Sequence, residues 1–258
     1  MTSLRERRSP ALAGIVSIAQ GSTGDGSTQQ LAAFPATDVK GWFASPEQGL
    51  VADIEAAAGV GPVTGALARL APSSITTVAV ADSDDACWAE VTRTADGDTE
   101  TCLVRLGYDS AGRVCRVVWL RAAFAPASEV AESRAAPDGR PILERYFAAL
   151  QDSRFGEAAA SFTPGTIYSH PPYGGGRERV LYRGREALHR GFVSDRGSSP
   201  VRQVITTFSQ QGDRAFVEGI IEGIPNGGTF FSTAQITSGG EIARYVAFYS
   251  AIRLPGCS

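Results

Sequence analysis

The side chain best suited by type and surroundings to proton transfer is His170. It is one of only two histidines, and it ends the strand-like segment 166–170, directly before Pro171 and Pro172. An unperturbed imidazole has a pKa of about 6.5, so it can take up and return a proton at neutral pH. Aromatic and proline neighbours would keep its surroundings dry. The alternative is a structural histidine that hydrogen-bonds a loop carbonyl.

Two carboxylates alternate with apolar residues along a later segment, residues 214–222. Glu218 and Glu222 share one face of the predicted strand with Phe216 and Ile220, because side chains two apart point the same way. If this face lines a pocket, Glu218 could orient the imidazole of His170. The alternative is a structural carboxylate held in an ion pair.

The other polar and aromatic candidates have simpler explanations. His189 follows Glu186 by three residues and falls off the apolar side of a predicted helix, so we expect it in solvent. The run Gly174-Gly175-Gly176 lacks the GxxxxGK[ST] pattern of a phosphate loop. An aromatic set either fills the core or forms pocket walls, and it comprises Tyr168, Tyr173, Tyr245, Phe248 and Tyr249.

The elements that must position these side chains begin at residue 138. A polar start at 138–141, with proline in the first turn, precedes Ile142, Tyr146, Phe147 and Leu150 at helical spacing. Two more helices are predicted over 155–162 and 185–192. Strands are predicted over 166–170, 201–210, 214–222, 229–237 and 241–251, with glycine-rich turns between the last four. This order predicts an α+β unit whose helices cover one face of a curved antiparallel sheet.

The chain contains this unit twice. A constant offset of 128, since 218 − 90 = 128 and 244 − 116 = 128, relates seven residues of each copy. They are Asp85, Glu90, Thr101, Ser110, Gly112, Arg116 and Val118, which match Asp213, Glu218, Thr229, Ser238, Gly240, Arg244 and Val246. We therefore predict domains over 1–123 and 139–258, joined by a linker over 124–138. The recurrence of Glu218 favours an ion pair with the equally repeated arginine.

Composition fits two globular domains. The 258 residues are 43% hydrophobic and 20% charged, which is typical of soluble proteins with their own cores. A net charge of −3 and a pI of about 5.5 give no general attraction to nucleic acid. No apolar run reaches the ~18 to 20 residues of a membrane helix. The basic segment 5–8 and the apolar segment 11–19 resemble an export signal, but we expect the first helix of copy one there and a cytoplasmic protein.

The cysteines indicate neither a metal site nor a disulfide framework. Cys87, Cys102, Cys115 and Cys257 show no CxxC pair and no histidine at ligand spacing. The partners of the first three in copy two are Ala215, Phe230 and Ala243, so we expect buried, reduced thiols. No metal or organic cofactor is implied, because the sequence contains no ligand cluster or nucleotide motif.

Three segments of copy two resemble the NTF2-like superfamily, and within it the SnoaL-like polyketide cyclases and the ketosteroid isomerases. They are the helix over residues 142–150, the segment Tyr182-Arg183-Gly184-Arg185-Glu186-Ala187-Leu188, and the closing Gly240-Glu241-Ile242-Ala243-Arg244-Tyr245. The resemblance implies a cone, in which a sheet curls round the first helix and leaves an apolar pocket at one end. It identifies the fold well and the reaction poorly.

The resemblance also suggests site residues. The isomerases place a tyrosine on the first helix, a carboxylate base at the end of the first strand and a carboxylic acid on a later strand. The matching residues are Tyr146, His170 and Ser232. The tyrosine is kept and could donate to a developing oxyanion, although a core aromatic is the alternative. The base has become an imidazole and the acid a hydroxyl, which puts the isomerase mechanism itself in doubt.

Copy one serves as an internal control. Subtracting 128 from these three positions gives Ile18, Trp42 and Val104, which are all apolar. We therefore expect one working pocket, in copy two. Members of this superfamily commonly dimerise through the outer face of the sheet, so a tandem chain is expected to form an intramolecular pseudo-dimer.

Two functions follow. The first is a cofactor-independent enzyme that transfers a proton on a hydrophobic carbonyl compound, as isomerases and cyclases do. His170 would be the base, Tyr146 the oxyanion donor and Glu218 an orienting carboxylate. The expected substrate contacts are Tyr168, Tyr173, Ser232, Tyr245 and Tyr249. The second is a non-catalytic module that binds a ligand or a protein.

Overall fold

The chain divides into two compact units, each described here by itself. The structure is a computed structural model that describes residues 4–20, 39–44, 54–69, 74–83, 85–95, 97–123, 136–173, 179–223, 225, 227–250 and 253–255. Described residues up to 123 belong to the N-terminal unit, and those from 136 to 254 belong to the C-terminal unit.

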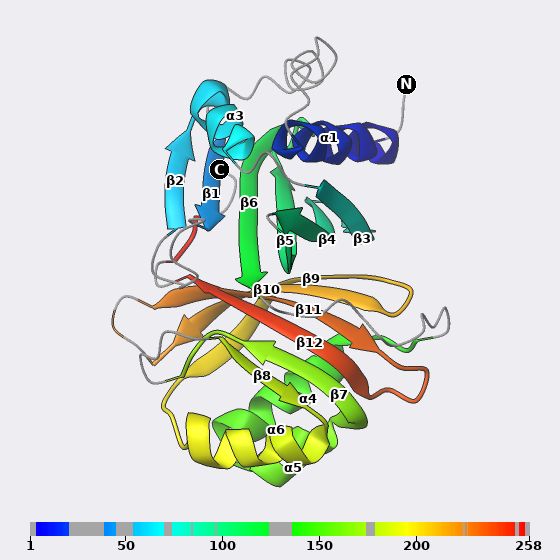
Figure 1. Cartoon of the computed structure of the whole chain (residues 1–258), viewed down its shortest axis with the longest axis vertical. Coiled ribbons are helices and arrows are strands. Elements are labelled where there is room, and N and C mark those ends of the chain that lie inside the picture. Colours follow the sequence, from blue (N-terminus) through cyan, green and yellow to red (C-terminus); the bar gives the residue numbers. More distant parts are fainter. Residues whose placement is uncertain are drawn as a thin grey trace. The chain divides into compact units, whose positions relative to one another are not determined.

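The N-terminal unit is a six-stranded mixed sheet with helices on one face (Figure 1). Its elements are α1 (Leu4–Ala19), β1 (Lys40–Ala44), β2 (Ile54–Ala58), α3 (Val60–Ala68), β3 (Ser74–Asp82), β4 (Ala86–Ala95), β5 (Asp98–Tyr108) and β6 (Val114–Ala123). The strand order is β2-β1-β6-β5-β4-β3, and β1 pairs with β6 in parallel.

The C-terminal unit repeats this arrangement. Its elements are α4 (Arg140–Gln151), α5 (Phe155–Ala160), β7 (Phe162–His170), β8 (Val180–Arg183), α6 (Arg185–Gly191), the π-helix η1 (Phe192–Arg196), β9 (Arg202–Gln211), β10 (Arg214–Glu222), β11 (Gly228–Ile236) and β12 (Ile242–Ser250). The order β8-β7-β12-β11-β10-β9 matches that of the first sheet strand for strand. The predicted tandem α+β fold is confirmed.

Strand register corrects one repeat assignment. Ser169 pairs with Val246, and Trp42 pairs with Val118, which lies 128 residues earlier. Trp42 therefore corresponds to Ser169, and the counterpart of His170 is Phe43. A slip of one residue moves a side chain to the other face of a sheet, and Phe43 indeed belongs to the N-terminal core. The predicted pairing of His170 with Trp42 is wrong by one position, although the partner is still apolar.

The core of the C-terminal unit contains a group of aromatic rings among its aliphatic residues. In α4 the predicted residues Ile142, Tyr146, Phe147 and Leu150 are buried, and so is Leu143. The ring of Tyr146 lies 4.9 Å from that of Phe162, edge to face, and 5.6 Å from that of Tyr245. Such arrangements favour one defined packing, so the helix holds the phenol of Tyr146 deep inside the unit.

Two elements differ from the prediction near the site. Strand β7 starts at Phe162 rather than at residue 166, because Pro164 lies where β7 has no β8 neighbour: β8 pairs only with Ile167–His170. A proline is tolerated at such an unpaired edge. Helix α6 is continued by the π-helix η1, whereas a single helix was predicted over 185–192.

The cysteine prediction is partly wrong. Cys87 and Cys102 are buried free thiols, as expected, and burial raises the pKa of Cys102. Cys115, on β6, is disulfide-bonded. An apolar residue at the matching position of copy two, such as Ala243 for Cys115, indicates that the cysteine is buried but says nothing of its oxidation state. The prediction of a reduced Cys115 was wrong for this reason. Cys257, the predicted linker up to residue 135 and the run Gly174-Gly175-Gly176 lie outside the described residues.

The N-terminal core is mostly aliphatic, and its aromatic members are Phe43, Tyr108 and the fully buried Trp119. Leu12, Ile15 and Ile18 of α1 point into it, in line with the first helix predicted there. The guanidinium of Arg105 lies 5.1 Å from the ring of Trp88. Within the described ranges, no helix combines the length and apolar character needed to cross a bilayer.

Candidate functional site

His170 lies at the end of β7 and is only 5% exposed. Its Nδ1 is 2.6 Å from the carbonyl oxygen of Pro171, and its Nε2 is 2.9 Å from the hydroxyl of Tyr249. A carbonyl oxygen can only accept, so Nδ1 carries the proton and Nε2 accepts from Tyr249. The backbone thereby fixes the tautomer that presents a lone pair at Nε2.

The imidazole is neutral at physiological pH. The pKa of His170 is lowered from 6.5 to about 3, mainly by burial and to a smaller extent by the positive charges of Arg179 and Arg196, while the hydrogen bond to Pro171 partly opposes this shift. A neutral imidazole therefore persists over the whole physiological range. His189, the other histidine, is exposed on α6 as predicted.

Tyr249, on β12, links His170 to β9, the strand at the far edge of the same sheet. Its hydroxyl accepts from Nε2 of Gln203 at 2.8 Å and donates to His170. Tyr249 and Gln203 are both partly exposed, unlike His170. The pair therefore forms the accessible side of the imidazole.

Three tyrosines form a second chain of hydrogen bonds. The hydroxyl of Tyr168 is 3.1 Å from that of Tyr146 and 3.2 Å from that of Tyr173. Burial raises the pKa of Tyr146 and of Tyr168 well above the ordinary value. Tyr146 and Tyr168 are each 1% exposed, whereas Tyr173 is only partly buried. The chain therefore runs from the core to an accessible phenol.

Ring stacking joins the two chains. The imidazole of His170 lies 4.4 Å from the ring of Tyr173, and it is parallel to the ring of Tyr168 within 6° at 5.9 Å. We call Tyr146, Tyr168, His170, Tyr173 and Tyr249 the phenol–imidazole cluster. Tyr146 and His170 thus belong to one cluster, but Tyr168 and Tyr173 stand between their polar atoms.

Ser232 and Tyr245 lie beside this cluster. The ring of Tyr245 stacks on that of Tyr168 at 5.3 Å and 15°. Burial raises the pKa of Tyr245, and the nearby hydroxyl of Ser232 offsets part of this effect. Both hydroxyls are buried, and they make no hydrogen bond of normal geometry in the described part of the chain. Two polar groups in the core therefore retain capacity for a further partner.

Glu218 does not face this cluster. On β10 the core-facing residues are Ala215, Val217 and Ile221, so alternation places Glu218 on the opposite face of the sheet. The prediction that Glu218 orients His170 is therefore corrected: its carboxylate lies on the outer face. Phe248 also falls outside the predicted pocket wall, because it alternates along β12 with the core-facing Tyr245 and Ala247.

The N-terminal unit is not purely apolar at the matching place. Arg121, 128 residues before Tyr249, follows Val117 and Trp119 on the core-facing side of β6. Its Nη2 is 2.7 Å from Glu100, which also bonds Arg93 at 2.8 Å. The three side chains are 9–18% exposed. Copy one therefore has a charged triad where copy two has Tyr249. The sequence analysis compared only the counterparts of Tyr146, His170 and Ser232, so it did not find this triad.

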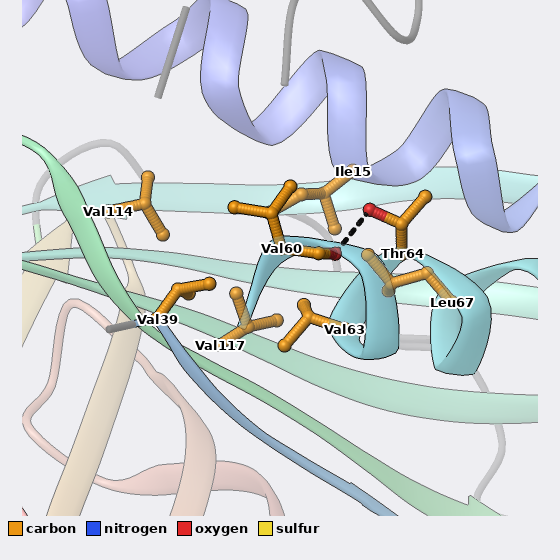
Figure 2. Close-up of a pocket in the computed structure, with 8 residues that line it drawn as sticks. All are labelled: Ile15, Val39, Val60, Val63, Thr64, Leu67, Val114 and Val117. Atoms are coloured by element: carbon orange, nitrogen blue, oxygen red, sulfur yellow. Dashed lines mark hydrogen bonds between the residues drawn. The ribbon is translucent and has the colours of Figure 1, made fainter. Parts of the chain in front are cut away.

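A small apolar hollow, partly open to solvent, lies in the N-terminal unit (Figure 2). Figure 2 shows it between α1, α3 and the strands β1 and β6. It is lined by Ile15, Val39, Val60, Val63, Thr64, Leu67, Val114 and Val117. Its one polar lining group, the hydroxyl of Thr64, donates to the carbonyl of Val60 at 2.7 Å. This hollow therefore offers a ligand apolar contact and no free polar group.

Sequence comparison finds a family model that is similar to most of the C-terminal unit. A family model described as "SnoaL-like domain" matches residues 143–250. The comparison with curated proteins gives no match. The described residues contain no group of three or more His, Cys, Asp or Glu side chains able to hold a metal ion.

Several solved structures are similar to about half of the chain. A protein of cystatin-like fold from Methylobium petroleophilum PM1 is 16% identical, with a TM-score of 0.38, over 49% of this chain and 84% of that one. A protein of ketosteroid isomerase-like fold from Catenulispora acidiphila is 17% identical, with a TM-score of 0.36, over 43% and 87%. The epoxide hydrolase/cyclase-like enzyme SalBIII, of pyran ring formation in salinomycin, is 20% identical, with a TM-score of 0.35, over 44% and 91%. The predicted resemblance is confirmed, with the matched SnoaL-like domain in the C-terminal unit.

Proposed function

We propose that the C-terminal unit binds a hydrophobic carbonyl compound and transfers a proton on it, as isomerases and cyclases do. The observation that supports this most is the buried, neutral imidazole of His170, whose tautomer is fixed by Pro171. A base must be unprotonated to abstract a proton from carbon, and the imidazole meets this requirement across the physiological range, while its lowered pKa also makes it a weaker proton acceptor.

The proposed step uses the Nε2 lone pair of His170. When the hydroxyl of Tyr249 turns from Nε2 to the ligand, Nε2 is free to take a proton from the carbon next to the carbonyl. The C–H electron pair then forms an enolate, and the imidazolium keeps its Nδ1 bond to Pro171. In a ligand with a carbon–carbon double bond next to that carbon, the enolate extends over the double bond, and return of the proton to its far carbon gives the conjugated isomer and restores the neutral base.

The tyrosine chain would stabilise the enolate oxygen. Tyr173 is its accessible end and would donate directly, while Tyr168 and Tyr146 support it through successive hydrogen bonds. Preorganised donors aimed at a developing oxyanion usually provide a large share of catalysis. Tyr146 therefore acts through its neighbours in this proposal, rather than by touching the ligand.

Deuterium exchange tests the proposal without the natural substrate. The full chain is incubated with 2-tetralone in D2O, and loss of the α-proton signal is followed by NMR. We expect exchange above the spontaneous rate, and we expect H170A and H170Q to lower the enzyme-dependent rate roughly 100-fold or more. H189A changes the other histidine, which is exposed, so it should exchange like the wild type. Equal rates for H170A and H189A would contradict the assignment of the base.

A second function is favoured by a specific observation. Both ring nitrogens of His170 already have partners, as in a histidine that only holds a strand end. In a non-catalytic binding module, 2-tetralone would bind without any exchange above background. Binding measured by calorimetry, with no exchange, therefore selects this alternative.

A further inference from the structure

We infer that Gln203 is a positioning residue for the proposed base: it holds the phenol oxygen of Tyr249 so that the hydroxyl hydrogen points at His170 until a ligand offers an acceptor. This inference rests on the proposed function and adds a residue to it that sequence patterns did not indicate. It starts from three successive hydrogen bonds that link the carbonyl of Pro171 to Gln203.

A single backbone group sets the direction of these hydrogen bonds. The carbonyl oxygen of Pro171 only accepts, so Nδ1 of His170 carries the hydrogen of the neutral ring and Nε2 accepts. Tyr249 uses its one hydroxyl hydrogen on Nε2, so its oxygen faces Gln203 with a lone pair. The amide of Gln203 must therefore present its NH2 group, in agreement with the 2.8 Å bond from its Nε2. An amide turned the other way would place two acceptors against each other.

The fold holds Gln203 within reach of Tyr249. Gln203 lies on β9 and Tyr249 on β12, and two further strands separate them in the sheet. Strands three steps apart are about 14 Å apart in a flat sheet, so these side chains meet because the sheet curls. Gln203 pairs with the core-facing Ile221, and so it points to the inner side. At the end of α4, Nε2 of Gln151 donates to the backbone carbonyl of Gln203 at 3.2 Å, which ties β9 to this helix.

The bond from Gln203 leaves the hydrogen of Tyr249 able to move. It uses a lone pair of the phenol oxygen, so it persists when the hydroxyl turns from Nε2 of His170 to a ligand. While the hydrogen points at Nε2, no lone pair is left there for a second proton. Proton uptake by His170 therefore depends on a ligand that brings an acceptor, such as a carbonyl oxygen, to Tyr249. Gln203 keeps the phenol oxygen in place throughout this turn.

A ligand-free titration tests the direction of the hydrogen bonds. The full chain carries isotope-labelled histidine and H189A, so that NMR observes one imidazole. Q203E replaces the donor by an acceptor of the same size, which attracts the hydroxyl hydrogen of Tyr249 away from His170. The imidazolium can then donate to the phenol oxygen, so we expect the pKa of His170 to rise by at least about 1.

Two controls separate this effect from the charge of the new carboxylate. In Q203E/Y249F the hydroxyl is missing, so the rise in the pKa of His170, measured against Y249F, should fall below about half. Q211E changes an exposed residue of the same strand and should leave this pKa unchanged. The other phenols and guanidinium groups that act on the imidazole are the same in all variants, and they are Tyr168, Tyr173, Arg179 and Arg196.

Deuterium exchange on 2-tetralone tests the positioning. Q203M keeps the size of the side chain and removes its donor, so we expect the rate at saturation to fall about tenfold with little change in Kd. Q203M/Y249F should lose no more than Y249F, because Gln203 acts only through Tyr249. A residue that merely stabilises the strand would add its own loss. Q211M is the matched control and should exchange like the wild type.

The outcomes separate the two proposals. A pKa of His170 that rises equally with and without the hydroxyl of Tyr249, or that does not rise, overturns the inference and leaves the proposed function standing. Rate losses that add in Q203M/Y249F overturn it as well. A wild type that does not exchange 2-tetralone contradicts the proposed function, and the ligand-free titration then still decides whether Gln203 sets the direction. Melting curves verify that Q203E and Q203M are folded.

Discussion

Desolvation controls the protonation state of His170. Its two hydrogen bonds place a donor at Nδ1 and an acceptor at Nε2. Burial lowers the pKa to about 3, so the ring stays neutral at any pH well above that value. The same bond to Pro171 that a structural histidine would make also fixes the tautomer that a base needs. The base and the structural histidine are therefore not exclusive interpretations of this residue.

The lowered pKa of His170 predicts how stability depends on pH. Between pH 6.5, its unfolded value, and pH 3, its folded value, the unfolded chain binds one more proton than the folded chain. The free energy of unfolding therefore falls as pH falls through this window, by about 3 kcal/mol from pH 7 to pH 4 for this residue. Carboxylates titrate in the same range, so the measurement is the difference between wild type and H170Q in urea unfolding. A difference that does not change with pH would contradict the buried, neutral imidazole.

Part of the site could be predicted at this scale and part could not. Tyr146 and His170 follow from helical spacing, from residue type and from resemblance, and the structure places them in one cluster. The bond between His170 and Tyr249 joins residues 79 apart in the chain. It depends on strand register, which local patterns do not fix. The π-helix η1, which ends at Arg196, was not predicted, because no local pattern in the sequence indicates a π-helix.

Among the elements, β10 depends on a single glycine. The register of β10 against β9 shifts between Glu218 and Gly219. A Cβ at Gly219 would lie 2.2 Å from the ring of Phe230 and 2.3 Å from the carbonyl oxygen of Val204. Phe230 in turn packs against Phe147 of α4 at 5.4 Å. Because Gly219 has no side chain, the ring of Phe230 can lie over it and pack against Phe147 of helix α4.

Substituting this glycine should destabilise the C-terminal unit. G219A forces both the ring of Phe230 and the backbone at Val204 to move, and we expect a loss of about 2 kcal/mol or more in the free energy of unfolding. G165A, in β7 of the same sheet, is the control, since nothing lies within 4 Å of its added methyl group. It should be neutral or stabilising by up to about 1 kcal/mol. Chemical denaturation of both variants makes the comparison, and equal stability would rule out the crowding argument.

Element types were predicted better than element limits. The strand over 214–222 has the limits that the alternation of side chains indicates, and those of the other three late strands agree within one residue. Strand β8, with four residues, was not predicted, because it is too short to show a period. The start of β7 was missed because Pro164 and Gly165 are usually breakers, and only the lack of a neighbouring strand makes them acceptable there.

At the scale of the whole molecule, two sheets of identical strand order follow one another in the chain. Their cores share no residue. The N-terminal unit replaces the polar positions of the site with Ile18, Phe43 and Val104, but it keeps the triad of Arg93, Glu100 and Arg121. Pairing of the two units through their outer sheet faces stays a prediction.

The oxidation state of the cysteines can be measured on the intact chain. Without reductant, denatured protein should react with iodoacetamide at Cys87 and Cys102 but not at Cys115. The folded protein should react at neither free thiol, because both are buried and burial raises the pKa of Cys102. Peptide mass spectrometry locates the labels, and reduction should then expose Cys115. Labelling of Cys115 before reduction would show that the bond is absent.

The contrasting aromatic content of the two units has a practical consequence. All three tryptophans, Trp42, Trp88 and Trp119, belong to the first copy, and six of the seven tyrosines belong to the second. Fluorescence excited selectively at indole therefore reports only on the N-terminal half, and phenol absorbance mostly on the other. One unlabelled sample can thus show whether the twin halves melt together, and which of them senses an added compound.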